Sequence, residues 1–129
     1  MNATAVAIGS GTLLTPASYQ RMVSTRQRTF GGPVPGCDSC RMGTDNYTYG
    51  MGVVINGHWL LQNPLFFGYA GTEGYLPSQK IAIAVAVTFE PEAFGATGEP
   101  PNSAFDLFLD LGAALAPDDP PLKSKTAAH

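Results

Sequence analysis

Two cysteines and a pair of amide residues are the side chains of this sequence whose spacing best suits chemistry. Cys37 and Cys40 stand in the stretch GCDSC, a spacing that occurs in disulfides, redox motifs and zinc sites. A structural zinc ion needs four ligands. The only histidines of the sequence are His58 and His129, and there is no second pair of cysteines. The sequence therefore argues against zinc and leaves a disulfide, a redox motif or free thiols.

The residues before the cysteines narrow these alternatives. A redox C-x-x-C normally opens a helix, where the helix dipole lowers the thiol pKa. Here Pro33, Pro35 and Gly36 precede the pair, so we expect a loop. We interpret Cys37 and Cys40 as a short disulfide that holds this loop, with free thiols as the alternative and a redox role as a more distant one.

The amide pair, Gln62 and Asn63, lies near the end of residues 47–70, an apolar, aromatic and glycine-rich stretch (YTYGMGVVINGHWLLQNPLFFGYA). Amide side chains can hydrogen-bond a substrate carbonyl, but they can equally end a hairpin strand. The aromatic residues of the stretch belong more often to a core than to a ligand platform. His58 is expected to be solvated at a strand end. Glu73 has no charged partner visible in the sequence, so we do not expect it to be catalytic.

The composition limits the class of protein. The chain has 129 residues, enough for one domain with a modest core. Charged residues make up only 13%, against about 25% in a typical globular domain. This shortage of charge indicates that part of the surface packs against something. The net charge is −3, and seven scattered basic residues make no nucleic-acid footprint.

No membrane segment is expected. No apolar run approaches the roughly 20 residues that a spanning helix needs, and no basic amphipathic stretch suggests a membrane surface. The first residues, MNATAVAIGSG, lack the basic region and the apolar region of a signal peptide.

A short helix is predicted to begin at Pro16. Thr15 can cap it, and proline suits the first helical position because its missing N–H has no partner there anyway. This helix should end before Arg26. Residues 25–46 then read as a long loop rich in glycine and proline, and loops of this length are uncommon unless they are functional or tied down.

A β-hairpin is predicted next. The dipeptide Asn56-Gly57 is the strongest short hairpin signal, because both central positions of a type I′ turn need positive φ. The strands would be residues 47–55 and 58–62.

Two further strands and a helix complete the expected elements. Residues 66–76 are predicted to form a third strand bent at its glycines. Residues 80–89 (KIAIAVAVTF) alternate Ile and Val with Ala, which predicts a strand that is covered on both faces. Residues 102–116 have helical spacing of apolar residues, with Asn102 or Ser103 as the cap.

The expected fold class is therefore α+β: an antiparallel meander of about four strands, a short N-terminal helix, and a C-terminal helix packed on the sheet. Residues 117–129 are expected to form a flexible tail after a domain of residues 1–116. The strand at 80–89 would be last in the meander, and its residues 81–89 (IAIAVAVTF) include no charge or proline to protect an edge. A partner strand from outside this chain is therefore expected.

The order of these elements resembles the C-terminal part of the serine β-lactamase and D-alanyl-D-alanine carboxypeptidase family, penicillin-binding-protein-like, in its class C-like and esterase-like branch. IGSGTLLTPASYQRMVS is similar to the family segment where G-x-L-L-S-P opens a helix, and YTYGMGVVINGHWLLQN to its Y-G-L-G-W strand and hairpin. GYLPSQKIAIAVAV and SAFDLFLDLGAALA are similar to its last hairpin and final helix. The resemblance implies a partial β-lactamase/transpeptidase-like fold.

The resemblance implies acyl transfer by three motifs. S-x-x-K supplies the nucleophile and a lysine that helps deprotonate it, Y-x-N or Y-x-S supplies a second acid/base group, and K-T-G or H-x-G lines the cleft. No S-x-x-K fits: Ser78–Lys80 is one residue too short, and Ser124 lies in the tail. No Tyr-x-Asn or Tyr-x-Ser precedes the hairpin. We therefore expect only the third motif here and no catalytic residue in this chain.

Two placements of the third motif compete. Gly68–Thr72 (GYAGT) is locally similar to it, with Tyr69 in the cationic position. The alternative is Gln62-Asn63-Pro64, which we favour because Gly68-Tyr69 then match the Gly-aromatic pair that follows the motif in the family. The N–H of Leu65 would then help to form the oxyanion hole.

This sequence departs from the family at both ends of the favoured motif. Gln62 is neutral where Lys or His is expected, and Pro64 replaces a glycine. These changes favour an ester-like substrate or an inactive relative over β-lactam or D-Ala-D-Ala recognition. The substrate-binding residues implied by the resemblance are Gln62, Asn63, Leu65 and Tyr69, with no cofactor and no metal.

We therefore expect the C-terminal segment of an exported, cell-envelope serine hydrolase acting on an ester, amide, β-lactam or peptidoglycan-like substrate. Its partner would be the missing N-terminal half of the domain, or a second copy joined through the edge strand. The alternative is a non-catalytic binding module that uses the aromatic hairpin and the exposed edge strand as its contact surface.

Overall fold

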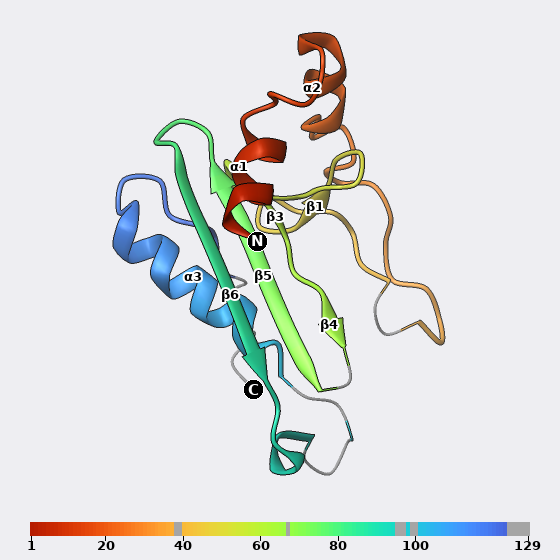
Figure 1. Ribbon diagram of the computed structural model, residues 1–129. Helices are drawn as coiled ribbons and strands as arrows, with labels where there is room; N and C mark the ends of the chain where they lie inside the picture. The colour runs from red at the N-terminus through yellow and green to blue at the C-terminus, as the bar shows by residue number, and fades with distance from the viewer. Residues whose placement is uncertain (38–39, 67, 95–97, 99–100, 124–129) are drawn as a thin grey trace.

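The computed structural model describes all residues except 38–39, 67, 95–97, 99–100 and 124–129, and the described part has an α+β fold. Three α-helices, one 3₁₀ turn and a curled antiparallel sheet of six short strands make up the described elements (Figure 1). The expected α+β class with an antiparallel sheet is confirmed, although the sheet has more and shorter strands than the expected four. The likeness to a partial β-lactamase fold stays a prediction.

The sheet is organised around one central strand. β5 pairs with β6 along its whole length on one edge, while β3 and β4 pair with successive halves of its other edge. β2 pairs with β3, and β1 pairs with β2. The strands are β1 (Thr48–Tyr49), β2 (Val54–Asn56), β3 (Trp59–Gln62), β4 (Leu65–Phe66), β5 (Tyr69–Leu76) and β6 (Ile81–Thr88).

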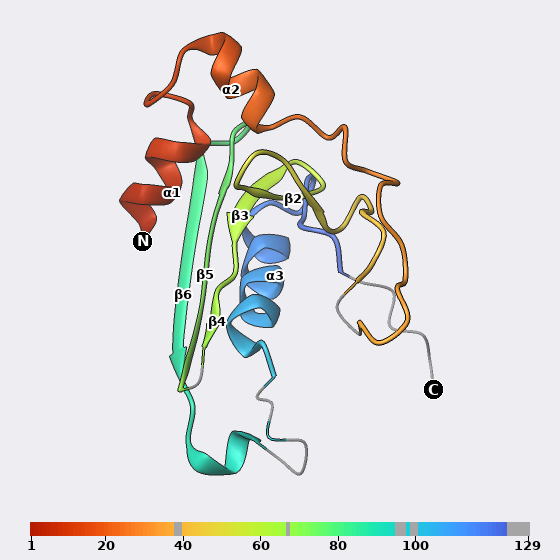
Figure 2. The same cartoon turned by 90° about the vertical axis from the view of Figure 1, so that its right-hand side faces the viewer.

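Helices cover both faces of the two long strands. α3 (Ser103–Leu115) contacts β5 and β6 from one side, and α1 (Asn2–Gly9) contacts the same strands from the other (Figure 2). The Ile and Val residues of β6 belong to the core under α3, so its alanines face α1. The alternation along β6 thus gives a bulky face for one helix and a shallow face for the other, and the expected cover on both faces is present.

The core under α3 is centred on two aromatic rings. Trp59 and Phe108 are fully buried and meet edge to face, with ring centroids 5.4 Å apart. Gly74 of β5 lies directly beneath Phe108, because a Cβ added there would come within 2.6 Å of the ring. The absence of a side chain at this glycine therefore lets α3 approach the sheet.

The prediction of a single strand over residues 47–55 is wrong. The chain doubles back at Gly50–Val53, so β1 and β2 form a small hairpin of their own. Gly52 has φ +78°, a value that favours glycine. At Gly50 an added Cβ would come within 2.0 Å of the Met22 carbonyl oxygen, which also accepts a hydrogen bond from Met51 N–H. This close approach to α2 (Pro16–Met22) bends the strand.

The next hairpin is confirmed, but its turn is shifted by one residue. Asn56 pairs with Trp59, so Gly57 and His58 form the turn, and only Gly57 has positive φ. A positive φ at the first central position alone is the pattern of a type II′ turn. Asn56 is kept in the strand because its buried side chain donates to the Asn46 and Leu122 carbonyls and accepts from Leu122 N–H.

The third predicted strand is also a hairpin, in which β4 turns into β5 with Gly68 at φ +108°. β3 and β4 keep one common register against β5. Pro64 interrupts them because it has no N–H to donate, yet its carbonyl still accepts from Gly71 N–H at 2.9 Å. β3 and β4 therefore act as one edge strand broken at a proline.

The helix boundaries follow the capping signals where such signals exist. Thr15 caps α2 by accepting from Ser18 N–H, and Asn102 caps α3 by accepting from Phe105 N–H, both as predicted. No element was predicted for residues 2–9, where α1 lies. Leu115, one of the apolar residues in the stretch whose spacing predicted α3, is 56% exposed.

The predicted flexible tail is partly ordered. Trp59 donates its Nε1–H to the Asp119 carbonyl at 2.9 Å, and Pro121 packs on Gly112 of α3. His58 lies 2.9 Å from the Asp119 carboxylate. Residues 117–123 therefore belong to the folded body, while residues 124–129 lie outside the described residues.

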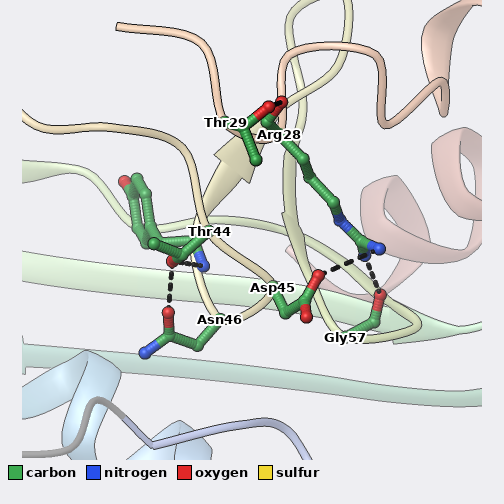
Figure 3. A network of polar contacts seen from close by, with 7 residues as sticks. Arg28, Thr29, Thr44, Asp45, Asn46 and Gly57 are labelled. Atoms are coloured by element: carbon green, nitrogen blue, oxygen red, sulfur yellow. Dashed lines mark hydrogen bonds and ion pairs between the residues drawn. The ribbon is translucent and has the colours of Figure 1, made fainter. Parts of the chain in front are cut away.

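The long loop of residues 25–46 is tied down in two ways. Arg28 pairs with Asp45 at 3.1 Å and donates to the Gly57 carbonyl, while Thr44 bonds to Asn46 (Figure 3). Cys37 and Cys40 form a disulfide, as predicted.

The two glycines on opposite faces of β5 give a matched test of this packing. We expect Gly74→Ala to lower the free energy of unfolding by about 1–3 kcal/mol, because the new methyl group overlaps the Phe108 ring. Gly71→Ala should instead leave stability unchanged or raise it by up to about 1 kcal/mol, since its nearest contact is 3.4 Å and glycine weakens a strand. Urea unfolding of both variants measures this. Equal effects would contradict the proposed packing of α3.

Candidate functional site

The four residues predicted to bind substrate lie where β3, β4 and β5 meet, but they do not share one face. Gln62 pairs with Glu73, and Leu65 pairs with Ala70. Because Ala70 belongs to the core under α3, Leu65 and Asn63 lie on the α3 face. Gln62 and Tyr69 lie on the opposite face, which carries α1. The structure therefore brings the side chains together as two pairs and not as one cluster.

Asn63 serves the architecture of the α3 face. Its Oδ1 accepts a hydrogen bond from the Tyr47 hydroxyl at 3.0 Å, and that hydroxyl lies 3.4 Å from the Tyr49 hydroxyl. The Tyr47 ring packs edge to face on Phe105 of α3. Burial, together with the hydrogen bond and charge of Tyr49, raises the pKa of Tyr47 to about 12.

Gln62 is held from the other direction. Its Nε2 donates to the Gly52 carbonyl at 2.7 Å, which ties the β1–β2 turn to β3. The side-chain oxygen of Gln62 is then the group left to accept from a ligand. A neutral amide held in this way can orient a ligand but cannot neutralise a carboxylate.

The main chain of Leu65 points toward an open edge. In antiparallel strands, pairs that exchange hydrogen bonds alternate with pairs whose N–H and C=O point outward. Pro64 and Gly71 are joined by the Gly71 N–H to Pro64 carbonyl bond, so the Leu65–Ala70 pair belongs to the outward kind. Within the described part of the sheet, β4 pairs only with β5. The Leu65 N–H is therefore directed away from β5, where the predicted oxyanion donor should point.

The competing motif placement does not form one surface. Gly68 lies in the β4–β5 turn, Tyr69 is 52% exposed, and Thr72 is fully buried on the α3 face. The Tyr69 ring instead lies against Phe66, with centroids 5.1 Å apart. These two aromatic rings form an exposed pair at the tip of the β4–β5 hairpin.

A hollow of about 420 Å³ lies on the α1 face beside this pair. Gly71 and Ala86 supply small residues at its centre, Tyr69 stands toward the hairpin tip, and Glu73 stands toward the middle of the sheet. The side chain of Met1 reaches over Gly71. The lining residues described are Met1, Gln62, Pro64, Tyr69, Ala70, Gly71, Glu73 and Ala86. This set contains no serine, cysteine, histidine or lysine, so the hollow lacks the nucleophile and base that the resemblance implies for acyl transfer.

Sequence reasoning missed the contribution of Glu73 and Gly71 to this hollow. Both lie on the same face of β5 as Tyr69, because they are separated from it by even numbers of residues. The period of two in the sequence could have grouped these three residues. It could not show that Met1, the residue before α1, covers Gly71, because no signal for α1 was recognised.

A second hollow, of about 680 Å³, lies between α2 and the β1–β2 turn. It is lined by Gln20, Arg21, Ser24, Arg26, Gln27, Tyr49, Gly50 and Met51. Its charged groups are the two guanidinium groups, and neither makes an ion pair with a described residue. None of the residues predicted to bind substrate lies there.

Other types of site find no support in the described part of the chain. No cluster of three or more metal-ligating side chains occurs among the residues whose positions are described. None of the helices within those residues has the length and apolarity needed to cross a bilayer. In comparisons with protein-family models, curated proteins and solved structures, no match to this chain was found.

The Tyr47 environment predicts an alkaline titration. Because the pKa is about 12 in the folded chain and 10.0 in an unperturbed tyrosine, the folded protein holds this proton more tightly. Its stabilising effect is complete below about pH 10 and is lost as the pH rises toward 12. Burial also raises the pKa of Tyr19, so both variants are made in a Tyr19→Phe background. We expect a late tyrosinate step in ultraviolet absorbance that Tyr47→Phe removes and Tyr69→Phe keeps. A late step that survives Tyr47→Phe in this background would contradict the prediction.

Proposed function

We propose that this chain is the C-terminal portion of an acyl-transfer serine hydrolase domain and that it supplies one wall of the active-site cleft. In this proposal the Leu65 N–H is one oxyanion donor, and the Gln62 side chain orients the acyl part of the substrate. The nucleophile and base come from a polypeptide segment outside these 129 residues. The observation that carries the proposal is the outward direction of the Leu65 N–H at the open edge.

The free edge of β6 supports an incomplete sheet. Phe89 N–H donates to the Gly68 carbonyl, so alternation along the β5–β6 ladder leaves the main-chain groups of Ala82, Ala84 and Ala86 pointing away from β5. The strand has eight residues, carries no charge and is covered by helices on both faces. A strand with these properties is usually found inside a sheet.

The outer surface of α1 supports the same proposal. Val6 is 41% exposed and Ile8 is 36% exposed, and no acidic or basic residue is present in this helix. A helix without a polar side is normally covered on more than one face. A segment that pairs with β6 would lie next to α1 and could cover these residues.

The departures from the family pattern favour an ester substrate in this proposal. Gln62 offers a neutral hydrogen-bonding group where a cation would hold a carboxylate. Pro64 leaves the ladder without one donor and brings a ring to a position where glycine would allow a ligand to approach. A substrate without a negative charge suits this wall better than a β-lactam carboxylate.

The first test is activity of the purified chain. We expect no hydrolysis of a chromogenic cephalosporin or of a short p-nitrophenyl ester, because the described wall contains neither the serine nor the lysine of the proposed mechanism. Absorbance assays of native and heat-denatured protein at equal concentration make the comparison. Turnover by the native chain above the denatured control would show that the nucleophile lies within these residues, which would refute the proposed division of the site.

The second test is self-association through β6. We expect the isolated chain to form dimers or larger species by sedimentation velocity, because the unpaired edge finds another copy. Ala86→Pro should restore the monomer while the fold remains, since it removes an outward N–H and no hydrogen bond to β5. Val85→Pro serves as the contrast, because that N–H bonds to β5 and its loss should destabilise the sheet. A monomeric wild-type chain that unfolds cooperatively would count against a missing strand.

A non-catalytic binding module is the second candidate function. The observation that favours it is the exposed pair Phe66 and Tyr69, each 52% accessible and in contact at the hairpin tip. Exposed aromatic pairs are common at recognition surfaces because they offer large area at low entropic cost. This candidate gains support if the wild-type chain proves to be a stable monomer.

A further inference from the structure

The hollow on the α1 face has a carboxylate at one end and an aromatic ring at the other, and acyl transfer does not explain this arrangement. Glu73 places a carboxylate at one end, and no described residue forms an ion pair or hydrogen bond with it. The residue of β3 that pairs with Glu73 is Gln62, whose amide nitrogen already donates to the Gly52 carbonyl. Its partner on β6 is Ala84, which offers no polar group. Among the described residues, the carboxylate therefore has no paired cation, although Met1, which carries the N-terminal ammonium, also lines the hollow.

The other end of the hollow is aromatic. Tyr69 lies four residues before Glu73 on the same face of β5, at roughly 13 Å along the strand. Phe66 pairs with Tyr69 in register and tilts its ring against it at 33°. Aromatic faces attract both flat apolar groups and organic cations.

The centre of the hollow is small and apolar. Gly71 lies between Tyr69 and Glu73. A Cβ added at Gly71 would make ordinary contacts, at 3.4–3.8 Å, with Met1, Val85 and Pro64. Ala86 lies opposite Gly71 on β6. Gly71 is buried under the Met1 side chain, whereas Ala86 is exposed, so the open part of the hollow lies over Ala86. The volume of about 420 Å³ is within the usual range of small-molecule sites.

We propose that this hollow binds a small organic cation with an apolar body, such as an arylalkylamine. The ammonium group pairs with the Glu73 carboxylate, the alkyl chain lies over Ala86 and against the Met1 side chain, and the aryl group packs on Tyr69. The low polarity of the surrounding residues strengthens the charge pair relative to one in open water. This binding belongs to the isolated chain and does not depend on acyl transfer.

The test uses three probes with one body and different charge: 4-phenylbutylamine, 4-phenylbutanol and 4-phenylbutyrate. Two-dimensional NMR titration of the isotope-labelled full chain gives affinities and sites together. We expect the amine to bind with a dissociation constant on the order of 1 mM, typical for a fragment of this size, and to shift the amides of β5 and β6. The alcohol should bind about fivefold more weakly, and the carboxylate less still.

Three variants assign the interaction to the hollow. Glu73→Gln should reduce amine affinity about fivefold, to that of the alcohol. Glu92→Gln removes the same charge from an exposed position in the 3₁₀ turn and should leave affinity unchanged. Gly71→Val fills the floor with a residue that suits a strand, and should abolish binding of all three probes while the spectrum stays folded.

Several outcomes would overturn the proposal. Equal binding of the three probes would show that the site has no preference for a cation. Wild-type affinity in Gly71→Val would place the binding elsewhere, and no shift at all with the amine would mean that the hollow is not a site. Because none of these measurements uses hydrolysis, failure here leaves the acyl-transfer proposal to its own tests.

Discussion

The hydrogen-bonded register of β5 is the constraint on which the rest of the structure depends. Two hydrogen bonds, Gly71 N–H to the Pro64 carbonyl and Phe89 N–H to the Gly68 carbonyl, set the alternation on its two edges independently. The two bonds give the same alternation: the main-chain groups of odd-numbered β5 residues bond to β3 and β4, and those of even-numbered residues bond to β6. This assignment decides which main-chain groups remain free at Leu65 and along β6.

The same register distributes side chains between the two helices. Even-numbered positions of β5 face α3, where Gly74 allows Phe108 to lie on the sheet next to Trp59. Odd-numbered positions face α1, where the chain places glycine, glutamate and tyrosine residues. One face is therefore filled by aromatic rings, and the other keeps open space. The core and the hollow are two consequences of one strand, which is why a one-residue slip would exchange them.

Local signals in the sequence predicted the elements that they govern directly. Thr15 and Asn102 cap helices through bonds to N–H groups three residues ahead, and the alternation of residues 81–88 requires a strand covered on both sides. The failures involve contacts distant in sequence. Asn56 reads as a turn residue, yet its bonds to Leu122, which lies 66 positions further along, keep it in the strand. Ordering of the chain near Asp119 through Trp59 has no local signal either.

The site residues show the same division. The third-motif placement at Gln62-Asn63-Pro64 made the Leu65 N–H an oxyanion donor, which stays a prediction, and the ladder directs this N–H away from β5. It could not foresee that Asn63 is committed to Tyr47 and Gln62 to Gly52, because both partners come from the β1–β2 hairpin, which was read as one extended strand. Glu73 was set aside because it has no partner in the sequence.

In the sequence, Glu73 was set aside because no charged partner was visible. On the sheet, the residues that pair with Glu73 are known, and neither of them carries a positive charge. An exposed glutamate in a loop is satisfied by water on all sides, whereas Glu73 stands between Ala84 and the Gln62 amide on a surface of small residues. Carboxylates in such positions are disfavoured in strands unless they protect an edge or meet a charge. Glu73 lies on the central strand, so edge protection does not explain it. A cation bound in the hollow, as proposed above, would give this carboxylate the charge that the described residues do not supply.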